Sequence, residues 1–388
     1  MTSVVDFDPL GPAMMEDPYP VYAELQREHP VFWQEQVRAW IITRYDDCRD
    51  ILMDGESYVR DPRRISEPSK DASASVQTLA AENQTELRRL LIGSMHAQDL
   101  PQLGRNVRAR IDEVFARVMS RPSFDWITEV AAPLAGGITA ELLGVSEPDP
   151  RVFQAVAEGM ALKFDEDLGE ENSEAASKVQ AAIDGFAVII DEWLASDETH
   201  GTILTIKNKA LELGVPLPVL KNSIGLLYSG SFTTIFGSSG NIGHTFIERP
   251  DVLEQLRDPG LLTTGVDELV RYHGPTWATG RVAMRPKEIR GMEIRPGDPL
   301  FVVVAAANRD PDQFPRPQEI VVDRTPNKHL GFGWGPRACI GSLFGHLALG
   351  ELVHALHDAP PLRLTGAPVR LPTITVRSFG SLPVTFQS

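Results

Sequence analysis

The chain of 388 residues is poor in cysteine, with only Cys48 and Cys339, which lie far apart. Neither belongs to a closely spaced pair, so a disulfide framework and a zinc-type cysteine cluster are excluded. The chain also has no run of about 18 apolar residues. Its first residues contain neither the basic nor the apolar segment of a secretory leader. We therefore expect a cytoplasmic protein without a membrane anchor.

Basic residues are outnumbered, with 37 Lys and Arg against 53 Asp and Glu and a formal net charge of −16 at pH 7. Binding to nucleic acid needs a basic face, so we expect no nucleic-acid partner. Low-complexity linkers, charge blocks and internal repeats are also missing, and we predict a single domain over residues 1–388. The composition, 42% hydrophobic and 23% charged, is typical of a globular protein with a sizeable core.

Apolar periodicity and chain breakers divide the first half of the chain. They predict a helix over residues 18–28, a β pair over 31–43 and a helix over 45–53. Residues 55–80 show no clean period, and we expect an irregular loop there, a kind of segment that is often functional. Residues 82–195 are predicted to be mainly helical.

The second half contains an unusual stretch over residues 219–248, which has no proline but several glycines. Each glycine costs about 1 kcal/mol relative to alanine in a helix interior, so propensity alone argues against one continuous helix. Residues 251–272 read as two helices, and residues 280–304 and 362–386 as short strands with tight turns. The expected class is therefore mainly α, in the α+β sense, with a small segregated β portion.

A glycine-punctuated loop runs from Phe332 to Gly341 and reads Phe-Gly-Trp-Gly-Pro-Arg-Ala-Cys-Ile-Gly, just before a helix predicted over 341–356. Its glycines allow positive φ or close backbone approach. Cys339 lies at the N-terminal end of that helix, where free N–H groups and the helix dipole favour a thiolate, and Arg337 adds a positive charge. We infer a metal ligand at Cys339; the alternative is a buried free cysteine in a glycine-rich turn.

These ten residues resemble the haem-thiolate signature of the cytochrome P-450 superfamily, Phe-Gly-x-Gly-x-Arg-x-Cys-x-Gly, and every fixed position is filled. The resemblance implies haem b with its iron bound by Cys339, and it places Phe332 and Gly333 at the cofactor. Thiolate ligation in this family favours cleavage of the O–O bond. The resemblance also implies the cytochrome P-450 fold, with one long helix crossing the haem, so we assign residues 219–248 to that helix.

Glu268 and Arg271 are three residues apart on a predicted helix and resemble the family's Glu-x-x-Arg pair, which is structural. The same spacing occurs at Glu254 and Arg257, where an ordinary surface ion pair is expected. Residues 307–311, Ala-Asn-Arg-Asp-Pro, resemble a further structural segment of the family. The resemblance thus covers most of the chain.

Haem carries two propionates, so its pocket needs cationic donors. By resemblance, Arg88, Arg281 and Arg337 take this role, with surface arginines as the alternative. The helix that carries Arg88 departs from the family's His-Thr-Arg-Leu-Arg-Arg-Leu pattern, because Gln84 replaces its histidine and Glu86 its first arginine. One propionate donor is therefore weakened or lost.

On the distal side, Gly230 and Thr233 match positions of the family's acid-alcohol motif, where the glycine opens a groove for O₂ and the threonine delivers protons. The acid of that motif is Phe232 here, which cannot carry a proton. Either protons pass through Thr233, Ser231, Ser229 and water, or the chemistry is diverted to oxidative coupling, nitric-oxide-linked reactions or peroxide use. Ordinary packing of small residues in a helix is the alternative for the whole cluster.

Substrate-pocket residues are assigned only by resemblance, and for each of them a core position is the open alternative. An apolar pocket with a few hydroxyls suits a small or medium organic molecule. The positions are Val76, Leu79, Met160, Phe164, Phe232, Thr276, Trp277 and Phe379.

The function that follows is a monooxygenase that inserts one atom of O₂ into an organic substrate. Electrons are expected from NAD(P)H through a ferredoxin reductase and a ferredoxin that docks near Cys339. Two alternatives stay open: a family member with diverted chemistry, for which Phe232 is the reason, and a non-catalytic haem or recruitment module.

Overall fold

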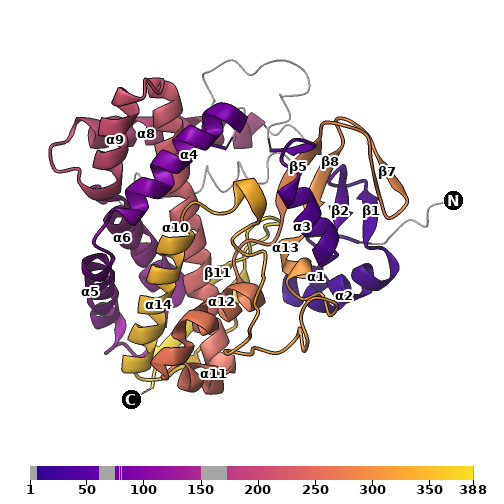
Figure 1. The fold of residues 1–388 in the computed structure, drawn as a ribbon. Helices are drawn as coiled ribbons and strands as arrows, with labels where there is room; N and C mark the ends of the chain where they lie inside the picture. Colours follow the sequence, from indigo (N-terminus) through magenta and orange to yellow (C-terminus); the bar gives the residue numbers. More distant parts are fainter. Residues whose placement is uncertain (1–6, 61–74, 78, 80, 150–172, 388) are drawn as a thin grey trace.

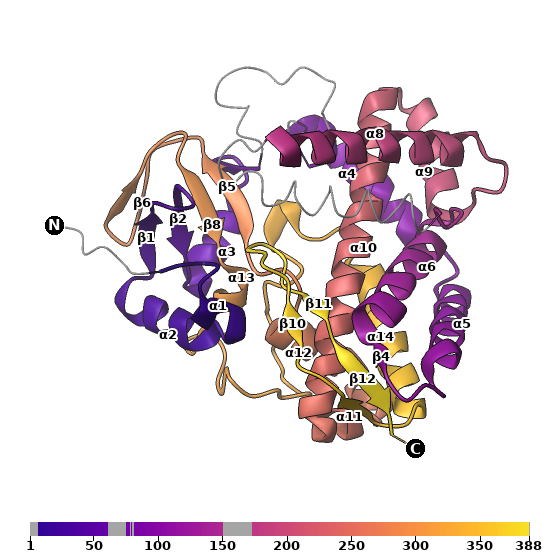
Figure 2. The same cartoon turned by 180° about the vertical axis from the view of Figure 1, so that it is seen from behind.

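A computed structural model describes residues 7–60, 75–77, 79, 81–149 and 173–387. Within these residues, a helix-rich part occupies one side of the molecule, and a sheet with α1 to α3 occupies the other (Figure 1; Figure 2 from behind). The helices are α1 Pro12–Glu16, α2 Tyr19–Glu28, α3 Tyr45–Met53, α4 Ala81–His96, α5 Leu100–Val118, α6 Ala132–Leu143, α8 Ser173–Ala195, α9 Gly201–Glu212, α10 Leu217–Glu248, α11 Pro250–Gln255, α12 Leu262–His273, α13 Val304–Ala307 and α14 Ser342–Asp358.

The largest sheet has the strand order β1-β2-β8-β5-β3. Its strands are β1 Val31–Gln34, β2 Ala39–Ile42, β8 Pro299–Val302, β5 Thr279–Ala283 and β3 Tyr58–Val59. The β pair predicted over 31–43 is confirmed as antiparallel β1 and β2, while β2 and β8 run parallel. The prediction of an irregular loop over 55–80 is wrong at β3, which is too short to show a sequence pattern and is defined by its pairing with β5.

Smaller strands form three further groups: β4-β12-β9, β10-β11 and the hairpin β6-β7. They are β4 Phe124–Asp125, β6 Lys287–Ile289, β7 Met292–Ile294, β9 Leu362–Leu364, β10 Val369–Arg370, β11 Phe379–Ser381 and β12 Pro383–Phe386. These strands confirm the β content predicted near the C-terminus. The mainly helical fold with separate small sheets is confirmed as well.

The long α10 is a continuous helix of 32 residues. Its glycines sit where neighbouring elements press against it: a Cβ on Gly237 would lie 2.8 Å from Pro275 Cβ, and one on Gly240 would lie 2.9 Å from Ile127 Cδ1. At Gly243 the neighbour is the indole of Trp126, 3.2 Å away. Close packing of buried neighbours thus outweighs the low helix propensity of glycine, which explains why propensity alone argues for the wrong answer here.

Two apolar clusters flank α10. One surrounds Trp126 and contains side chains of α5, α6 and α14, and the other surrounds Trp193 and contains side chains of α4, α8 and α9. Phe232 on α10 and Ile340, the residue after Cys339, pack against both clusters. The middle of α10 and the cysteine loop therefore both border the two clusters.

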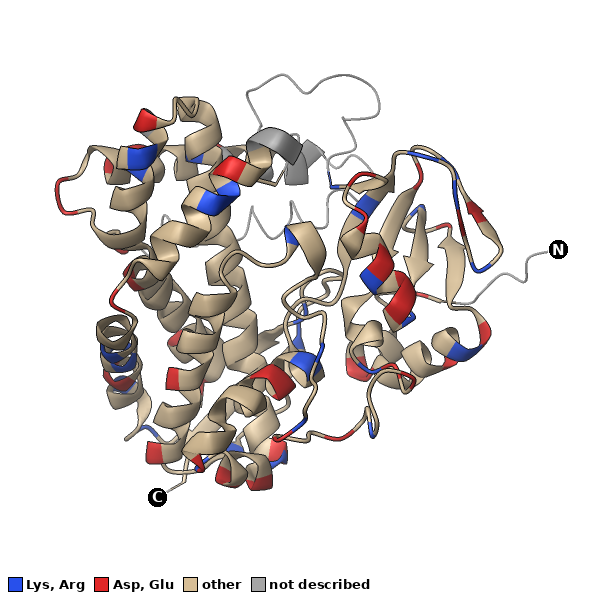
Figure 3. Ribbon diagram, in the orientation of Figure 1, with Lys and Arg blue, Asp and Glu red and all other residues tan. Residues whose placement is uncertain are grey.

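Charged residues mix both signs over the outer helices, whereas α10 is charged only near its ends, at Lys221 and Glu248 (Figure 3). Among the described residues, no helix combines the length and the apolar character that crossing a membrane requires.

Candidate functional site

The loop before α14 is held by short backbone hydrogen bonds. The N–H of Cys339 donates to the carbonyl of Phe332 over 2.7 Å, and the N–H of Gly333 donates to the carbonyl of Leu330 over 2.8 Å. Gly333 and Gly335 have φ of +67° and +70°, so the predicted positive φ is present at both glycines. A side chain at Gly335 would also press on Met53 of α3. The loop is thus clamped between α3 and α14 with its cysteine near the end.

The side chain of Cys339 is accessible to solvent, although protein surrounds it. This surrounding raises the pKa of the thiol, and it outweighs the N–H of Gly341 and the charges of Arg88 and Arg60, which lower it. The expectation that the helix end alone favours a thiolate is therefore wrong for the free thiol. One physical reason is desolvation, which disfavours the charged thiolate. The other is that α14 begins only at Ser342, so Cys339 precedes the first helical turn, where the helix dipole acts.

The three predicted propionate donors come from three separate elements. Arg88 on α4 donates to the carbonyl of Ala338, the residue before Cys339. Arg337 donates to the carbonyl of Gln77 over 2.7 Å. Arg281 on β5 is 5% exposed and donates to the carbonyl of Gly280 over 2.7 Å. Arg88 and Arg337 are thus tied to backbone on either side of the cysteine loop.

Arg60 is a member of this group that sequence reasoning missed. It directly follows β3, and it donates to Oγ1 of Thr279 over 3.0 Å. Pairing of Val59 with Val282 places Arg60 beside Arg281. The only signal in the sequence was an arginine after a two-residue apolar segment, which is too common to interpret.

Two of these cations, Arg60 and Arg281, lie close together, because both donate to Oγ1 of Thr279. Within the part of the chain that the structure describes, Arg60, Arg88 and Arg281 make no ion pair with Asp or Glu. Burial, and then the neighbouring charges of Arg60 and Arg337, lowers the pKa of Arg281 to about 9. Anionic groups are required to balance such a cluster, and the two propionates of a haem fit this need, with the thiol of Cys339 as ligand for its iron.

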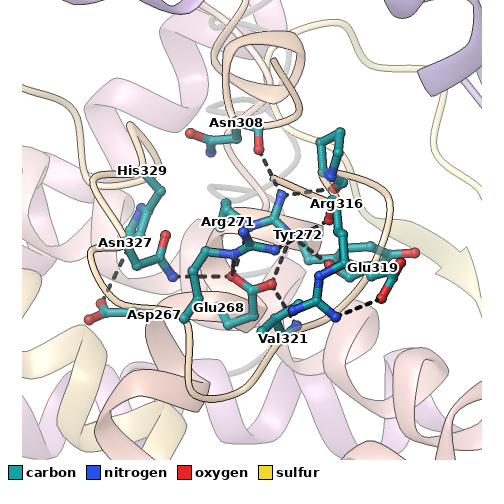
Figure 4. A network of polar contacts seen from close by, with 12 residues as sticks. Asp267, Glu268, Arg271, Tyr272, Asn308, Arg316, Glu319, Val321, Asn327 and His329 are labelled. Carbon is teal, nitrogen blue, oxygen red and sulfur yellow. Dashed lines mark hydrogen bonds and ion pairs between the residues drawn. The ribbon is translucent and has the colours of Figure 1, made fainter. Parts of the chain in front are cut away.

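The ion pair predicted between Glu268 and Arg271 is present and is fully buried (Figure 4). Nε and Nη2 of Arg271 donate to the two carboxylate oxygens, each over 2.8 Å. The same guanidinium donates to the carbonyls of Asn308 over 2.8 Å, Pro317 over 3.0 Å and Glu319 over 2.8 Å. The pair therefore organises the chain that leads toward the cysteine loop.

Three further donors complete the pairing of Glu268. They are Nε of Arg324 at 3.0 Å, the N–H of Val321 at 2.8 Å and Nδ2 of Asn327 at 3.2 Å. Burial raises the pKa of Glu268, but Arg271 and Arg324 outweigh it, and the net shift is downward. Arg324 was not found from the sequence, because no spacing rule links it to Glu268.

On α10, Gly230 borders open space, since a Cβ built there would meet no atom within 4 Å. Thr234 donates back to the carbonyl of Gly230, whereas the neighbouring Thr233 makes no side-chain hydrogen bond with any residue that the structure describes. The ring of Phe232 stacks on that of Phe236 with centroids 6.1 Å apart. The hydroxyl of Thr233 thus lies near Gly230, which leaves room beside α10.

The other two hydroxyls of the expected relay lie differently on α10: Ser229 is four residues before Thr233 and shares its face, whereas Ser231 does not. Ser229 is buried and donates to the carbonyl of Leu226 over 3.4 Å, and Ser231 accepts from Thr139 of α6 over 3.3 Å. On a helix, residues two apart point in nearly opposite directions, so Ser231 faces away from Thr233. The expected relay through Thr233, Ser231, Ser229 and water therefore stays a prediction, in which Ser231 would need water to reach Thr233.

For the expected substrate pocket, the packing favours the core alternative at three positions. Trp277 is buried among aromatic residues near the N-terminus and lies under Arg377, and Phe379 is buried under Arg370. Val76 is buried, and its N–H donates to Ser223 over 3.0 Å.

Of the remaining assigned positions, three lie among the described residues and two do not. Thr276, Leu79 and Phe232 are only partly buried. Met160 and Phe164 lie outside the described residues. Thr276 pairs with Val376 in an isolated β-bridge, which joins its segment to the C-terminal strands.

Comparisons with known proteins agree with the fold. The sequence profile of the family described as Cytochrome P450 matches residues 248–356. Mycinamicin IV hydroxylase/epoxidase from Micromonospora griseorubida is 30% identical, over 92% of this chain and 90% of its own length. Cytochrome P450 monooxygenase PikC from Streptomyces venezuelae is 29% identical, over 98% and 94%. The crystal structure of CalO2 has a TM-score of 0.86 and 26% identity over 98% of both chains.

The helical fold and these relatives define the class of the protein as a haem monooxygenase, an oxidoreductase. The chain belongs to the cytochrome P450 family. The family implies a haem cofactor, an organic substrate, O₂ and a redox partner.

Proposed function

We propose that the protein is a haem-thiolate monooxygenase in which Cys339 holds the iron of haem b. The observation that carries this proposal is the accessible thiol of Cys339 beside the cations Arg60, Arg88 and Arg281, which have no acidic partner among the described residues. The overall reaction consumes the substrate, O₂, two electrons and two protons, and it yields the oxygenated product and water.

The chain's residues hold the cofactor from two sides. Cys339 would coordinate the iron from the loop, with Phe332 and Gly333 as further residues at the cofactor. The propionates are bound by Arg60, Arg88, Arg281 and Arg337. When bound, the haem iron activates O₂, and thiolate ligation favours cleavage of the O–O bond.

The open space beside Gly230 would admit O₂ and the reacting part of the substrate. The hydroxyl of Thr233 holds a proton near this space and passes it on, with water as its source, because Ser229 and Ser231 are bonded elsewhere. Phe232 and Thr276 contact the substrate, and the apolar surroundings suit a small or medium organic molecule.

Electrons are supplied by a ferredoxin, which is reduced by an NAD(P)H-dependent reductase and docks on the side of Cys339. This proposal rests on the family, whose members need a redox partner.

The test of iron ligation is the Soret band of the reduced, CO-bound holoenzyme. We expect the red-shifted band that is characteristic of a thiolate ligand, and we expect Cys339→Ala to lose it. Cys48→Ala is the matched control, because Cys48 is the other cysteine and lies buried in α3. A Cys339→Ala protein that keeps the red-shifted band contradicts the proposal.

Diverted chemistry is the second candidate, and the specific observation in its favour is that Phe232 occupies the acid position and stacks on Phe236. The substitution Phe232→Asp distinguishes the two. A larger fraction of electrons recovered in oxygenated product supports a monooxygenase, whereas loss of the native product supports diverted chemistry.

A further inference from the structure

Two neighbouring acids of α12 point to different parts of the chain. Glu268 binds the segment before the cysteine loop, as described above, whereas Asp267 binds two histidines that flank that loop. Oδ1 of Asp267 lies 3.3 Å from Nε2 of His329 and 2.7 Å from Nε2 of His346 on α14. Figure 4 shows Asp267 and His329 beside the Glu268 network.

The hydrogen bonds of His346 require both of its ring nitrogens to carry protons. Nδ1 lies 2.8 Å from the carbonyl of Ser342, and Nε2 faces the carboxylate of Asp267. A carbonyl and an ionised carboxylate can only accept, so the ring that satisfies both is an imidazolium. His329 differs, because its Nδ1 accepts the N–H of Gly331 over 3.1 Å, and it is satisfied as a neutral ring.

Phe332 lies between the two histidines. Its ring centroid is 4.8 Å from that of His346 and 5.8 Å from that of His329. The ring also rests on the backbone of α14, since a Cβ on Gly345 would lie 3.1 Å from Phe332 Cε1. The carbonyl of Phe332 accepts the N–H of Cys339, so a displacement of Phe332 would also displace Cys339.

We propose that protonated His346, held by Asp267, is a positioning residue that keeps Phe332 and the Cys339 loop in place, so that ligation of the iron weakens when His346 loses its proton. The proposal rests on the proposed function of Cys339. It assigns to Asp267 a role distinct from that of Glu268, which binds the segment before the loop.

The sign of the pH effect follows from the groups around the ring. The titratable groups that face His346 are Asp267 from α12 and His329 from the loop, while α5 meets α14 elsewhere, where Glu351 approaches Gly104. The hydrogen bond and charge of Asp267 outweigh burial and raise the pKa of His346 above its usual 6.5. The positioning of Phe332 by His346 is therefore complete below about pH 6.5, and it is lost as the pH rises through the raised pKa of His346.

The experiment follows the red-shifted Soret band of the reduced, CO-bound holoenzyme as the pH rises from below about 6.5 toward 9. We expect the wild-type fraction with this band to fall along the titration. We expect His346→Arg, which keeps the charge at every pH, to show no fall. We expect His346→Gln to show at low pH the reduced fraction that the wild type shows at high pH.

His357→Gln is the matched control, because His357 lies on the same helix and its ring bonds to the carbonyl of Leu253 and not to Asp267. It should follow the wild-type profile. If His346→Arg falls with pH as the wild type does, the inference is overturned, and this comparison does not depend on how well His346→Gln folds. If the wild type never shows the red-shifted band, the proposed function of Cys339 fails instead.

Discussion

Arg60 and Arg281 donate to the same acceptor, Oγ1 of Thr279, each over 3.0 Å. Two guanidinium groups that share one hydroxyl repel each other, and no carboxylate of the described residues offsets this. The sequence departs from the family pattern at Gln84 and Glu86 on α4, where one propionate donor is expected to be weakened or lost, and Arg60 directly follows β3. We therefore place Arg60 among the proposed propionate donors.

The first prediction concerns retention of haem. Arg60→Gln should weaken haem binding about tenfold at low salt, because a hydrogen bond to a charged group contributes about 1.5–3 kcal/mol and solvent screening reduces this for an accessible side chain. The measurement is transfer of haem to an excess of an acceptor apoprotein. Arg285→Gln is the control, since Arg285 is exposed and pairs with the exposed Glu56. Equal transfer of haem from both variants would show that Arg60 does not bind the haem.

The second prediction concerns the buried network around Glu268. Glu268→Gln should lower the free energy of unfolding by about 3–5 kcal/mol, because Arg271 and Arg324 stay buried without a countercharge. Denaturant unfolding measures the change. Glu254→Gln, which breaks an exposed pair with Arg257 at the same spacing, should cost less than about 1 kcal/mol. Similar costs for the two variants would show that burial is not what gives the Glu268 pair its importance.

The third prediction concerns the conformation of the cysteine loop. Gly335→Ala should cost about 1–2 kcal/mol for the left-handed backbone alone. The added Cβ would also lie 3.0 Å from the carbonyl oxygen of Leu52 and 3.0 Å from Cα of Met53, which cannot rotate away. We expect a lower melting temperature and a smaller fraction of the red-shifted CO band. Gly280→Ala, whose Cβ meets nothing within 4 Å, should leave both unchanged.

The fourth prediction separates two glycines of α10. Gly230→Ala should raise the free energy of unfolding by up to about 1 kcal/mol, because alanine is the better helix former and its Cβ enters open space. The same Cβ should lower the affinity for CO, if the space admits the diatomic ligand. Gly237→Ala should instead lower the free energy of unfolding, because its Cβ would lie 2.8 Å from Pro275 Cβ. Unchanged CO affinity in Gly230→Ala would place the ligand elsewhere.

Local sequence patterns predicted several features of the fold and of the candidate site. The antiparallel pair β1 and β2, the ion pair of Glu268 with Arg271 and the positive φ of Gly333 and Gly335 all depend on residues close in the sequence, and all are confirmed. The roles of Cys339 and the predicted arginines stay predictions, and so does the single domain. For the confirmed features, spacing and residue type decide the geometry because the interacting atoms belong to one turn, one helix or one hairpin.

Other features depend on contacts between distant segments. Arg60 reaches Thr279 only because β3 pairs with β5, and Arg324 reaches Glu268 through a loop without a regular period. The pKa of Cys339 is likewise decided by the protein around it, which outweighs the local helix end and cations.

By itself, then, the sequence determined the family, the cysteine loop and the spacing of the buried ion pair, since these are written in short runs of residues. Only the tertiary structure decided that Arg60 joins the cation cluster, that Trp277 and Phe379 are core, and that His346 and Asp267 flank Phe332. The physical reason is burial: it is set by which distant side chains pack together, and it determines which charges need partners and which rings can reach a ligand.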